Sequence, residues 1–120
     1  MRPRKRGDIG EDYAAQWLCR RGCRILARNY AVRGGEIDIV ALSGDTLLFV
    51  EVKTRRAGGM CAPAEAVDRR KRRRILLCAQ QYIADTGNPA QPRFDVAEVY
   101  LDGVRPVRIN YIENAFGEED

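Results

Sequence analysis

Asp38, Glu51 and Lys53 have types and a spacing that could hold a cation against a phosphate group. They lie on either side of Gly44-Asp45, a two-residue sequence that favours a β-hairpin turn. If these two residues form the loop, the numbers of paired residues sum to 89, so Asp38 faces Glu51. Opposed Cβ atoms lie about 4.5–5.5 Å apart, where two like charges destabilise the hairpin unless a cation neutralises them. The sequence therefore predicts a carboxylate pair that needs Lys53, a neighbouring arginine or a divalent metal.

Mg²⁺ suits these residues because this hard ion takes oxygen ligands and commonly uses one or two carboxylates. We expect Asp38 and Glu51 to bind Mg²⁺, with Mn²⁺ as a substitute, and the backbone carbonyl of Val52 to be a third ligand. Side chains alternate along a strand, so Lys53 projects from the same face as Glu51, where it can contact a water on the metal or the phosphate. An ion pair between Lys53 and the opposed Glu36 is the structural alternative.

A further acid, Glu11, lies on the first predicted helix. The apolar stripe of this helix contains Ile9, Tyr13, Ala14, Trp17 and Leu18. At about 100° per residue, Glu11 borders the stripe whereas Asp12 points to solvent, so of the two only Glu11 can reach the sheet. Glu11 either adds a carboxylate to the metal site or stabilises the helix N-terminus through the helix dipole.

Six consecutive cations open the second predicted helix: Arg69, Arg70, Lys71, Arg72, Arg73 and Arg74. They wrap around about 600° of helix, so they cannot share one solvated face. A phosphate backbone explains this density of positive charge better than snorkelling does, and Arg55 and Arg56 add to it beside the predicted site. A membrane surface fits less well because the stretch is not strongly amphipathic. We therefore expect these eight cations to bind nucleic acid.

Composition narrows the classes of function. The chain has 120 residues, of which 45% are hydrophobic and 32% charged, with a net charge of +4, which is typical of one soluble globular domain. The absence of histidine excludes Ser-His-Asp triads, Cys-His pairs and His-ligated zinc or haem. Cys19, Cys23, Cys61 and Cys78 lack the CxxC spacing of a zinc ribbon, so we expect buried free thiols. Without an apolar run for a signal peptide or a bilayer span, we expect a cytoplasmic protein with no membrane contact.

The pattern along the chain predicts a helix, three strands, a second helix and two strands. The helices are expected from Asp8 to Gly22 and from Pro63 to Thr86, and the strands over 23–30, 36–42, 46–55, 93–101 and 107–112. The second helix is long enough for a parallel crossover between the third and fourth strands. The expected fold class is α/β, with a single mixed β-sheet of four to five strands flanked by helices. Residues 1–7 are expected to be a basic flexible arm, 8–113 a single domain and 114–120 an acidic tail.

Short motifs over residues 8–100 carry a family resemblance. They are Gly10-Glu11 with Ala14 and Leu18, Asn29-Tyr30, Gly35-Glu36-Ile37-Asp38, Phe49-Val50-Glu51-Val52-Lys53-Thr54-Arg55, Glu65-Ala66-Val67, Lys71, and Arg93-Phe94-Asp95-Val96. Together they resemble the YraN-like family of uncharacterised bacterial proteins. That family is similar to the restriction-endonuclease-like PD-(D/E)xK nucleases, and most closely to the archaeal Holliday junction resolvases.

The resemblance implies a restriction-endonuclease-like fold and a set of roles in a nuclease-like domain. It implies that Asp38 and Glu51 bind Mg²⁺, that Lys53 assists the attacking water, and that Glu11 corresponds to the acidic residue on the first helix of the resolvases. Ile37 stands where the motif's name has proline, at a position that varies widely in the superfamily and supplies no ligand.

We therefore expect a Mg²⁺-dependent nuclease or nuclease-like protein that hydrolyses a phosphodiester. DNA is favoured over RNA, and branched or structured DNA is the substrate that the family analogy suggests. The alternative is a non-catalytic nucleic-acid-binding or adaptor module in which Lys53 neutralises the carboxylates. A homodimer would grip a branched substrate more easily, although the sequence assigns no residues to such an interface.

Overall fold

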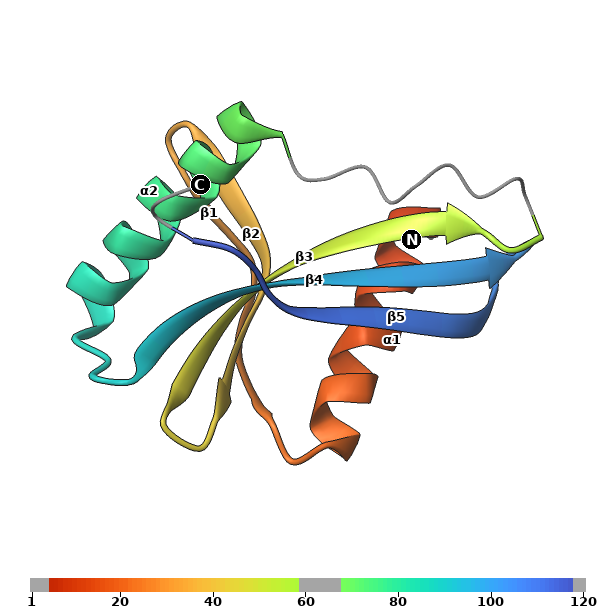
Figure 1. Ribbon diagram of the computed structural model, residues 1–120, viewed down its shortest axis with the longest axis horizontal. Helices are drawn as coiled ribbons and strands as arrows, with labels where there is room; N and C mark the ends of the chain where they lie inside the picture. Colours follow the sequence, from red (N-terminus) through yellow and green to blue (C-terminus); the bar gives the residue numbers. More distant parts are fainter. Residues whose placement is uncertain (1–4, 59–67, 118–120) are drawn as a thin grey trace.

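The fold of the chain is a five-stranded mixed sheet with one helix on each face (Figure 1). The computed structural model describes residues 5–58 and 68–117. Its elements are α1 (Arg6–Arg20), β1 (Arg24–Val32), β2 (Gly35–Ser43), β3 (Thr46–Arg56), α2 (Arg69–Thr86), β4 (Gln91–Asp102) and β5 (Arg105–Phe116). The expected class, an α/β fold with a single mixed sheet flanked by helices, is confirmed.

The strands follow one another across the sheet in the order β1-β2-β3-β4-β5. All neighbours are antiparallel except β3 and β4, which run parallel. A parallel pair requires a crossover connection, and α2 lies in this connection, as the length of the second helix predicted. The crossover brings the cationic start of α2 to the β1–β2 hairpin (Figure 1).

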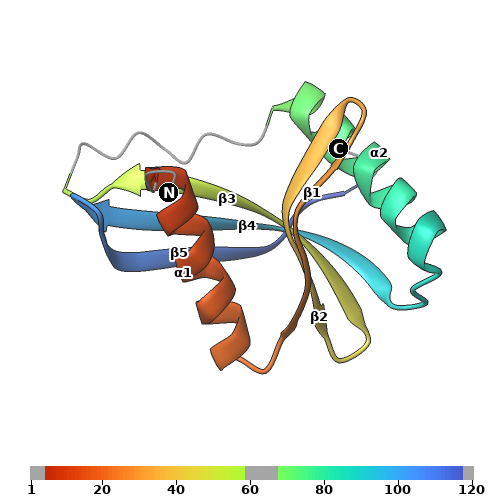
Figure 2. The ribbon, with the colours of Figure 1, turned by 180° about the vertical axis from the view of Figure 1, so that it is seen from behind.

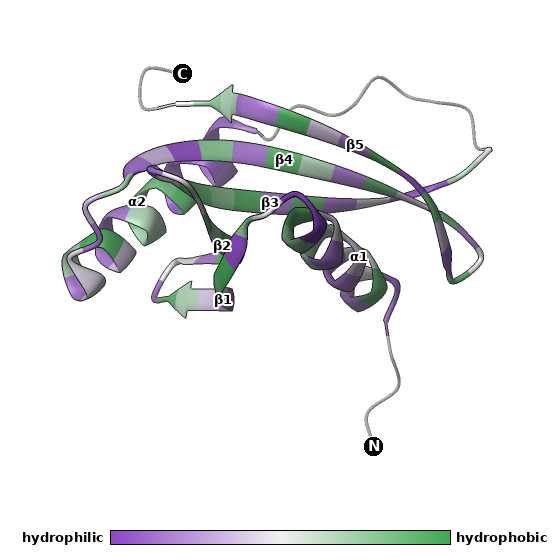
Figure 3. Cartoon of the chain, turned by 90° about the horizontal axis from the view of Figure 1, so that it is seen from below, coloured by the Kyte–Doolittle hydropathy of each residue, from purple (hydrophilic) through white to green (hydrophobic). Residues whose placement is uncertain are grey.

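Both faces of the sheet are apolar because a helix packs on each (Figure 2). Along β3, Leu47 and Phe49 belong to the core under α2, whereas Leu48 and Val50 belong to the core under α1. In Figure 3 hydrophobic and polar residues alternate along β4. This packing agrees with the expected sheet flanked by helices, because apolar residues on both faces of the hairpin need covering.

The hairpin turn at Gly44-Asp45 produces the predicted register near the turn. The pairs run from Ser43–Thr46 to Ile39–Val50, and their numbers sum to 89 as expected. A turn that follows the right-handed twist of the strands therefore fixed the pairing of the apolar part of the hairpin.

Beyond the Ile39–Val50 pair the ladder between β2 and β3 ends, so the expected backbone pairing of Asp38 with Glu51 is wrong. β2 stays paired with β1 over this stretch. Alternation along the strand puts Ile37 and Ile39 on the same face of the hairpin, but Ile37 joins the core under α2 and Ile39 the core under α1. Over this stretch β2 is paired with β1 but not with β3, and a two-stranded ribbon twists more strongly than a wider sheet. The stronger twist turns Ile37 toward α2.

The ends of the domain also differ from expectation. α1 begins at Arg6, within the expected arm, because the Asp8 carboxylate accepts a hydrogen bond from the Lys5 N–H at 3.3 Å and caps the first turn. β5 continues to Phe116, within the expected tail, because Phe116 is buried and stacks on Phe94. The expected start of the second helix at Pro63 lies outside the described residues, and α2 begins at Arg69.

The cysteines follow the expectation of buried free thiols only in part. Cys78, on the buried side of α2, is free and buried, Cys23 is half-buried, and Cys19 is exposed. Cys19 follows the buried Leu18 on α1 and so points away from the sheet. Cys61 lies outside the described residues.

The helices in the described ranges have 15 and 18 residues. Neither α1 nor α2 has the length and apolar composition of a membrane-crossing helix.

The position of α2 depends on a close backbone contact with the start of β2. A Cβ atom on Gly35 would lie 2.9 Å from the carbonyl oxygen of Arg74, closer than real Cβ contacts allow. We predict that Gly35→Ala lowers the free energy of unfolding by about 1–3 kcal/mol, because two backbones must separate. Urea unfolding of both proteins measures this difference. Gly7→Ala, which meets no atom within 4 Å, is the control and should leave stability equal or slightly higher. Equal stability of the Gly35→Ala variant and the parent would contradict the contact.

Candidate active site

The candidate site begins where β2 and β3 separate. The Val52 N–H donates a hydrogen bond to Asp38 Oδ2 at 2.7 Å. Asp38 thus takes the place of a backbone acceptor of β2, and its carboxylate lies in the gap between the two strands rather than directly against Glu51.

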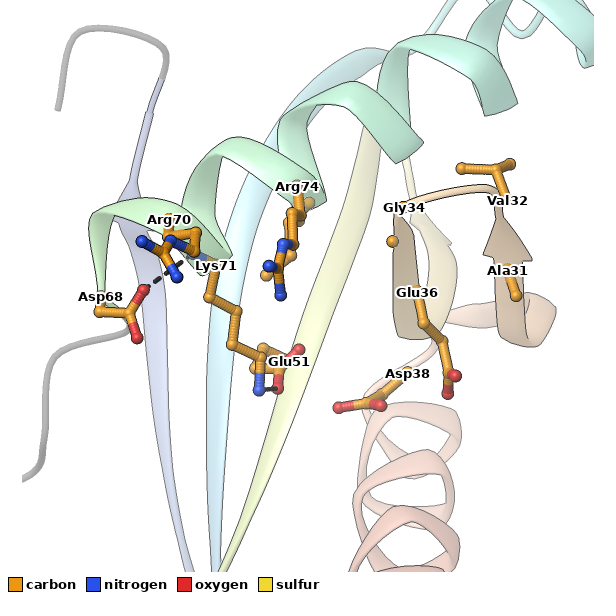
Figure 4. Close-up of a pocket in the computed structure, with 12 residues that line it drawn as sticks. Ala31, Val32, Gly34, Glu36, Asp38, Glu51, Asp68, Arg70, Lys71 and Arg74 are labelled. Carbon is orange, nitrogen blue, oxygen red and sulfur yellow. Dashed lines mark hydrogen bonds and ion pairs between the residues drawn. The ribbon is translucent and has the colours of Figure 1, made fainter.

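A pocket of about 1000 Å³ opens between this gap and the first turns of α2 (Figure 4). Its acidic lining comes from β2, from β3 and from Asp68, the N-cap of α2, and its basic lining comes from α2. The charged residues that line it are Glu36, Asp38, Glu51, Asp68, Arg70, Lys71 and Arg74. The fold thus combines a carboxylate cluster and part of the basic run in one cavity.

Glu51 is the most deeply buried of these acids, with 6% of its surface exposed. Lys71 Nζ lies 2.6 Å from its Oε1, and Lys53 Nζ lies 3.9 Å from the same oxygen. The predicted need of Glu51 for a cation is confirmed, but the closest cation is Lys71 of α2 rather than Lys53. In Figure 4 the Lys71 side chain descends from α2 to Glu51.

The pKa values of Lys71 and Lys53, which share Glu51 as a partner, shift in opposite directions. Burial alone would lower the pKa of Lys71, but the hydrogen bond and attraction to Glu51 outweigh it and hold the pKa above the ordinary value. Burial and the neighbouring Lys71 ammonium lower the pKa of Lys53. Lys53 is therefore the lysine that gives up its proton more easily.

Asp38 is held in an unfavourable environment for a carboxylate. Burial and the negative charge of Glu51 raise its pKa to about 7, and Glu11 adds to the effect, whereas the hydrogen bond from Val52 opposes it. A second positive charge in the gap would stabilise the ionised form.

Glu11 reaches the site because α1 approaches β3 at Gly10, where a side chain would collide with Thr54. Burial raises the pKa of Glu11, and Arg28, whose Nη2 lies 3.9 Å from it, opposes that shift. The expectation that Asp12 points to solvent is wrong, because Asp12 forms a 2.8 Å ion pair with Arg28 of β1.

Asn29 is a site residue whose role the sequence reasoning missed. With its amide oriented so that Nδ2 faces the acids, it donates to Glu11 Oε1 at 2.9 Å and to Glu36 Oε1 at 3.1 Å. Its backbone is left-handed, with φ of 51°. The sequence signal for this conformation was the residue type, since asparagine tolerates it better than most side chains.

The alternative ion pair of Lys53 with Glu36 is not formed, because Lys53 contacts Glu51.

The basic run divides into three orientations, so the prediction that it cannot share one solvated face is confirmed. Arg70 and Arg74 line the pocket with Lys71, the Nε of Arg72 is buried, and Arg69 and Arg73 are exposed. Elsewhere, Arg55 contacts Glu98 at 3.6 Å and Arg56 is exposed. Nucleic-acid binding by these residues stays a prediction.

The residues in the gap form a set of oxygen donors that fits a hard cation in part. The N–H and C=O of one strand residue point to the same edge, so the Val52 carbonyl is directed toward the gap that its N–H faces. Asp38, Glu51 and this carbonyl would be the ligands of Mg²⁺. In this structure the cation that contacts Glu51 most closely is the Lys71 ammonium. In the described ranges no group of three or more His, Cys, Asp or Glu side chains is placed to hold a metal ion.

The raised pKa of Asp38 makes a prediction about stability. Its folded-state pKa of about 7 exceeds the ordinary 3.8, so the folded state holds a proton that the unfolded chain releases, and stability falls as the pH rises from about 4 to 7. Asp38→Asn keeps an oxygen for the Val52 N–H and removes the charge. We predict that this variant is more stable than the parent at pH 8 by about 1–3 kcal/mol and that the difference narrows toward pH 4.

Urea unfolding in EDTA at the two pH values checks this prediction. Asp45→Asn, in the exposed hairpin turn, is the matched control and should change stability little at either pH. An Asp38→Asn variant that is less stable than the parent at pH 8 would show that the carboxylate stabilises the fold.

Comparison with known proteins supplies a family. The family described as "Uncharacterised protein family UPF0102" matches residues 10–99. A UPF0102 protein of Caldanaerobacter subterraneus subsp. tengcongensis is 44% identical over 113 residues, which cover 92% of this chain and 93% of that protein. One of Symbiobacterium thermophilum is 46% identical over 114 residues, covering 94% and 97%. One of Clostridioides difficile is 43% identical over 117 residues, covering 97% and 100%. The chain therefore belongs to the uncharacterised protein family UPF0102, the YraN-like family that its motifs resemble.

Proposed function

We propose that the protein is a metal-dependent nuclease of the PD-(D/E)xK kind, acting on DNA by Mg²⁺-assisted phosphodiester hydrolysis. The observation that carries the proposal is the pair of acids, the buried Glu51 and the half-buried Asp38, at the gap between β2 and β3, with the cationic start of α2 at the rim of the same pocket. An acid with a raised pKa, as at Asp38, beside a cluster of cations is typical of functional sites rather than of structural cores.

In the proposed nuclease, the residues of the pocket have three roles: metal binding, proton transfer and phosphate binding. Asp38, Glu51 and the Val52 carbonyl would hold Mg²⁺, which when bound supplies a lower pKa for water and neutralises charge on the phosphate. Lys53 projects from the face of Glu51, and its lowered pKa suits it to orient the attacking water or to take up a proton. Arg70 and Arg74 line the pocket where they can hold the phosphate backbone.

The contact of Lys71 with Glu51 has to open for this chemistry. Its Nζ lies 2.6 Å from a carboxylate oxygen that the metal would need. Lys71 lies in the first turn of α2 between Arg70 and Arg74, which line the pocket. A DNA phosphate that enters the pocket would offer Lys71 a second anionic partner, and the metal could then replace the ammonium on Glu51.

The alternative function is a non-catalytic nucleic-acid-binding or adaptor module. The same 2.6 Å contact favours it, because Lys71 can neutralise Glu51 without any metal. This differs from the expected form of the alternative, in which Lys53 was the neutralising lysine. Under this alternative the pocket would bind a phosphate backbone and leave it intact.

A cleavage panel separates the two functions. We predict that the protein cuts branched or otherwise structured DNA with Mg²⁺ or Mn²⁺, and that Asp38→Asn lowers the rate at least about 100-fold while DNA binding persists, because only a metal ligand is lost. Labelled linear, branched and single-stranded DNA and matching RNA are the substrates. Asp102→Asn, in the exposed β4–β5 turn, is the control and should cut like the parent. Binding without cleavage of any substrate favours the module.

Metal affinity tests the role of Lys71 without turnover. We predict that Lys71→Met raises the affinity for Mn²⁺ by about tenfold in titration calorimetry without DNA, because the competing ammonium is gone. Arg73→Met removes an exposed cation of the same helix and should leave the affinity close to that of the parent. Equal affinity in Lys71→Met and the parent would mean that the lysine does not stand where the metal binds.

A further inference from the structure

Two rows of side chains cross β3, β4 and β5 beside the candidate site. The strand register aligns Lys53 with Glu98 and Asn110 in the first row. It aligns Arg55 with Tyr100 and Arg108 in the second row. Because side chains alternate along β3, Lys53 and Arg55 project from the same face of the sheet as Glu51. The rows therefore extend the candidate site along the sheet.

The described helices leave this part of the sheet face uncovered. α2 packs on the face that carries Glu51, over β1 and β2 and over the part of β3 and β4 that holds Phe49 and Phe94 (Figure 1). α1 packs on the opposite face, over β3, β4 and β5 (Figure 2). The residues of these rows are polar and cationic, as on a sheet face that is open to solvent.

The first row fixes a guanidinium group. Glu98 is 2% exposed, accepts a hydrogen bond from Asn110 Nδ2 at 2.8 Å, and lies 3.6 Å from Arg55 Nη2. That Nη2 is buried and has no hydrogen-bond acceptor within the described part of the chain. Lys53, next to it on β3, has 28% of its side chain exposed. The two rows thus place an arginine that Glu98 orients beside an accessible lysine, which suits a phosphate.

The second row forms a flat platform. The Cζ of Arg108 lies 4.0 Å from the centre of the Tyr100 ring, so the guanidinium covers the aromatic face. Arg108 is exposed whereas Tyr100 is half-buried. A guanidinium plane backed by an aromatic ring is a surface on which an unpaired nucleic-acid base stacks, and its N–H groups remain able to contact phosphate.

We propose that this face, made of Lys53, Arg55, Tyr100 and Arg108, binds a single strand of DNA that leaves the candidate site. Arg55 and Lys53 hold its phosphate backbone, and the Arg108–Tyr100 platform stacks an unpaired base. The stacking platform requires an unpaired base, so this face suits a single strand rather than a duplex. The inference rests on the proposed function only in that the strand continues into the pocket.

Binding without metal tests this inference in the Asp38→Asn background, where cleavage does not interfere. Fluorescence anisotropy compares a blunt DNA duplex with the same duplex carrying a single-stranded overhang. We expect tighter binding of the overhang, and we expect Arg108→Ser to weaken overhang binding about tenfold while blunt-duplex binding stays the same. Tyr100→Phe should retain the preference and Tyr100→Ala should lose it.

The matched control is Arg105→Ser, which removes an exposed arginine of the same strand whose neighbour is Asp102 rather than an aromatic ring. Equal losses in Arg108→Ser and Arg105→Ser, or no preference for the overhang in the parent, would overturn the inference. Cleavage of branched DNA without an overhang preference would leave the nuclease proposal standing alone. An overhang preference without cleavage of any substrate would leave the single-strand surface standing alone.

Discussion

The candidate site depends on the hydrogen bond from the Val52 N–H to Asp38 Oδ2, because this bond forms where the ladder between β2 and β3 ends. A continued ladder would press two acids together across the hairpin. Instead one acid satisfies the backbone of β3, and the strands part around it. The result is a gap that holds buried negative charge, which shows in the pKa of about 7 at Asp38.

That negative charge determines which cations gather around it. Lys53 belongs to β3 and Lys71 to α2, which are separate elements of the chain. Both ammonium groups nevertheless contact the Glu51 carboxylate. The crossover places α2 there, and the backbone contact of Gly35 with Arg74 sets its height above β2. A nuclease and a binding module would share all of this geometry. The nuclease and the binding module differ in which cation contacts Glu51 Oε1, a metal ion or the Lys71 ammonium.

The same sheet carries charge beyond the pocket. β3 is apolar under the helices near the hairpin turn and turns polar past Glu51, where Lys53 and Arg55 follow. The helices α1 and α2 lie on opposite faces of the sheet, and α2 leaves the half of its face beyond Glu51 uncovered. On the face of Glu51, that half is cationic and holds a stacked arginine on Tyr100. A sheet with helices placed in this staggered way can carry a core and a polyanion-binding surface on one face.

Local pattern by itself determined the strands, the hairpin register near Gly44-Asp45 and the parallel crossover, and it indicated that Glu51 needs a cation. These follow from alternation and turn chemistry, which act over a few residues. Only the tertiary structure decided that the strands part at Asp38, that Asn29 bridges two acids, and that Lys71 rather than Lys53 lies closest to Glu51. The reason is that ion pairs and buried hydrogen bonds join side chains from separate elements, and their partners are chosen by twist and helix placement, which no short pattern encodes.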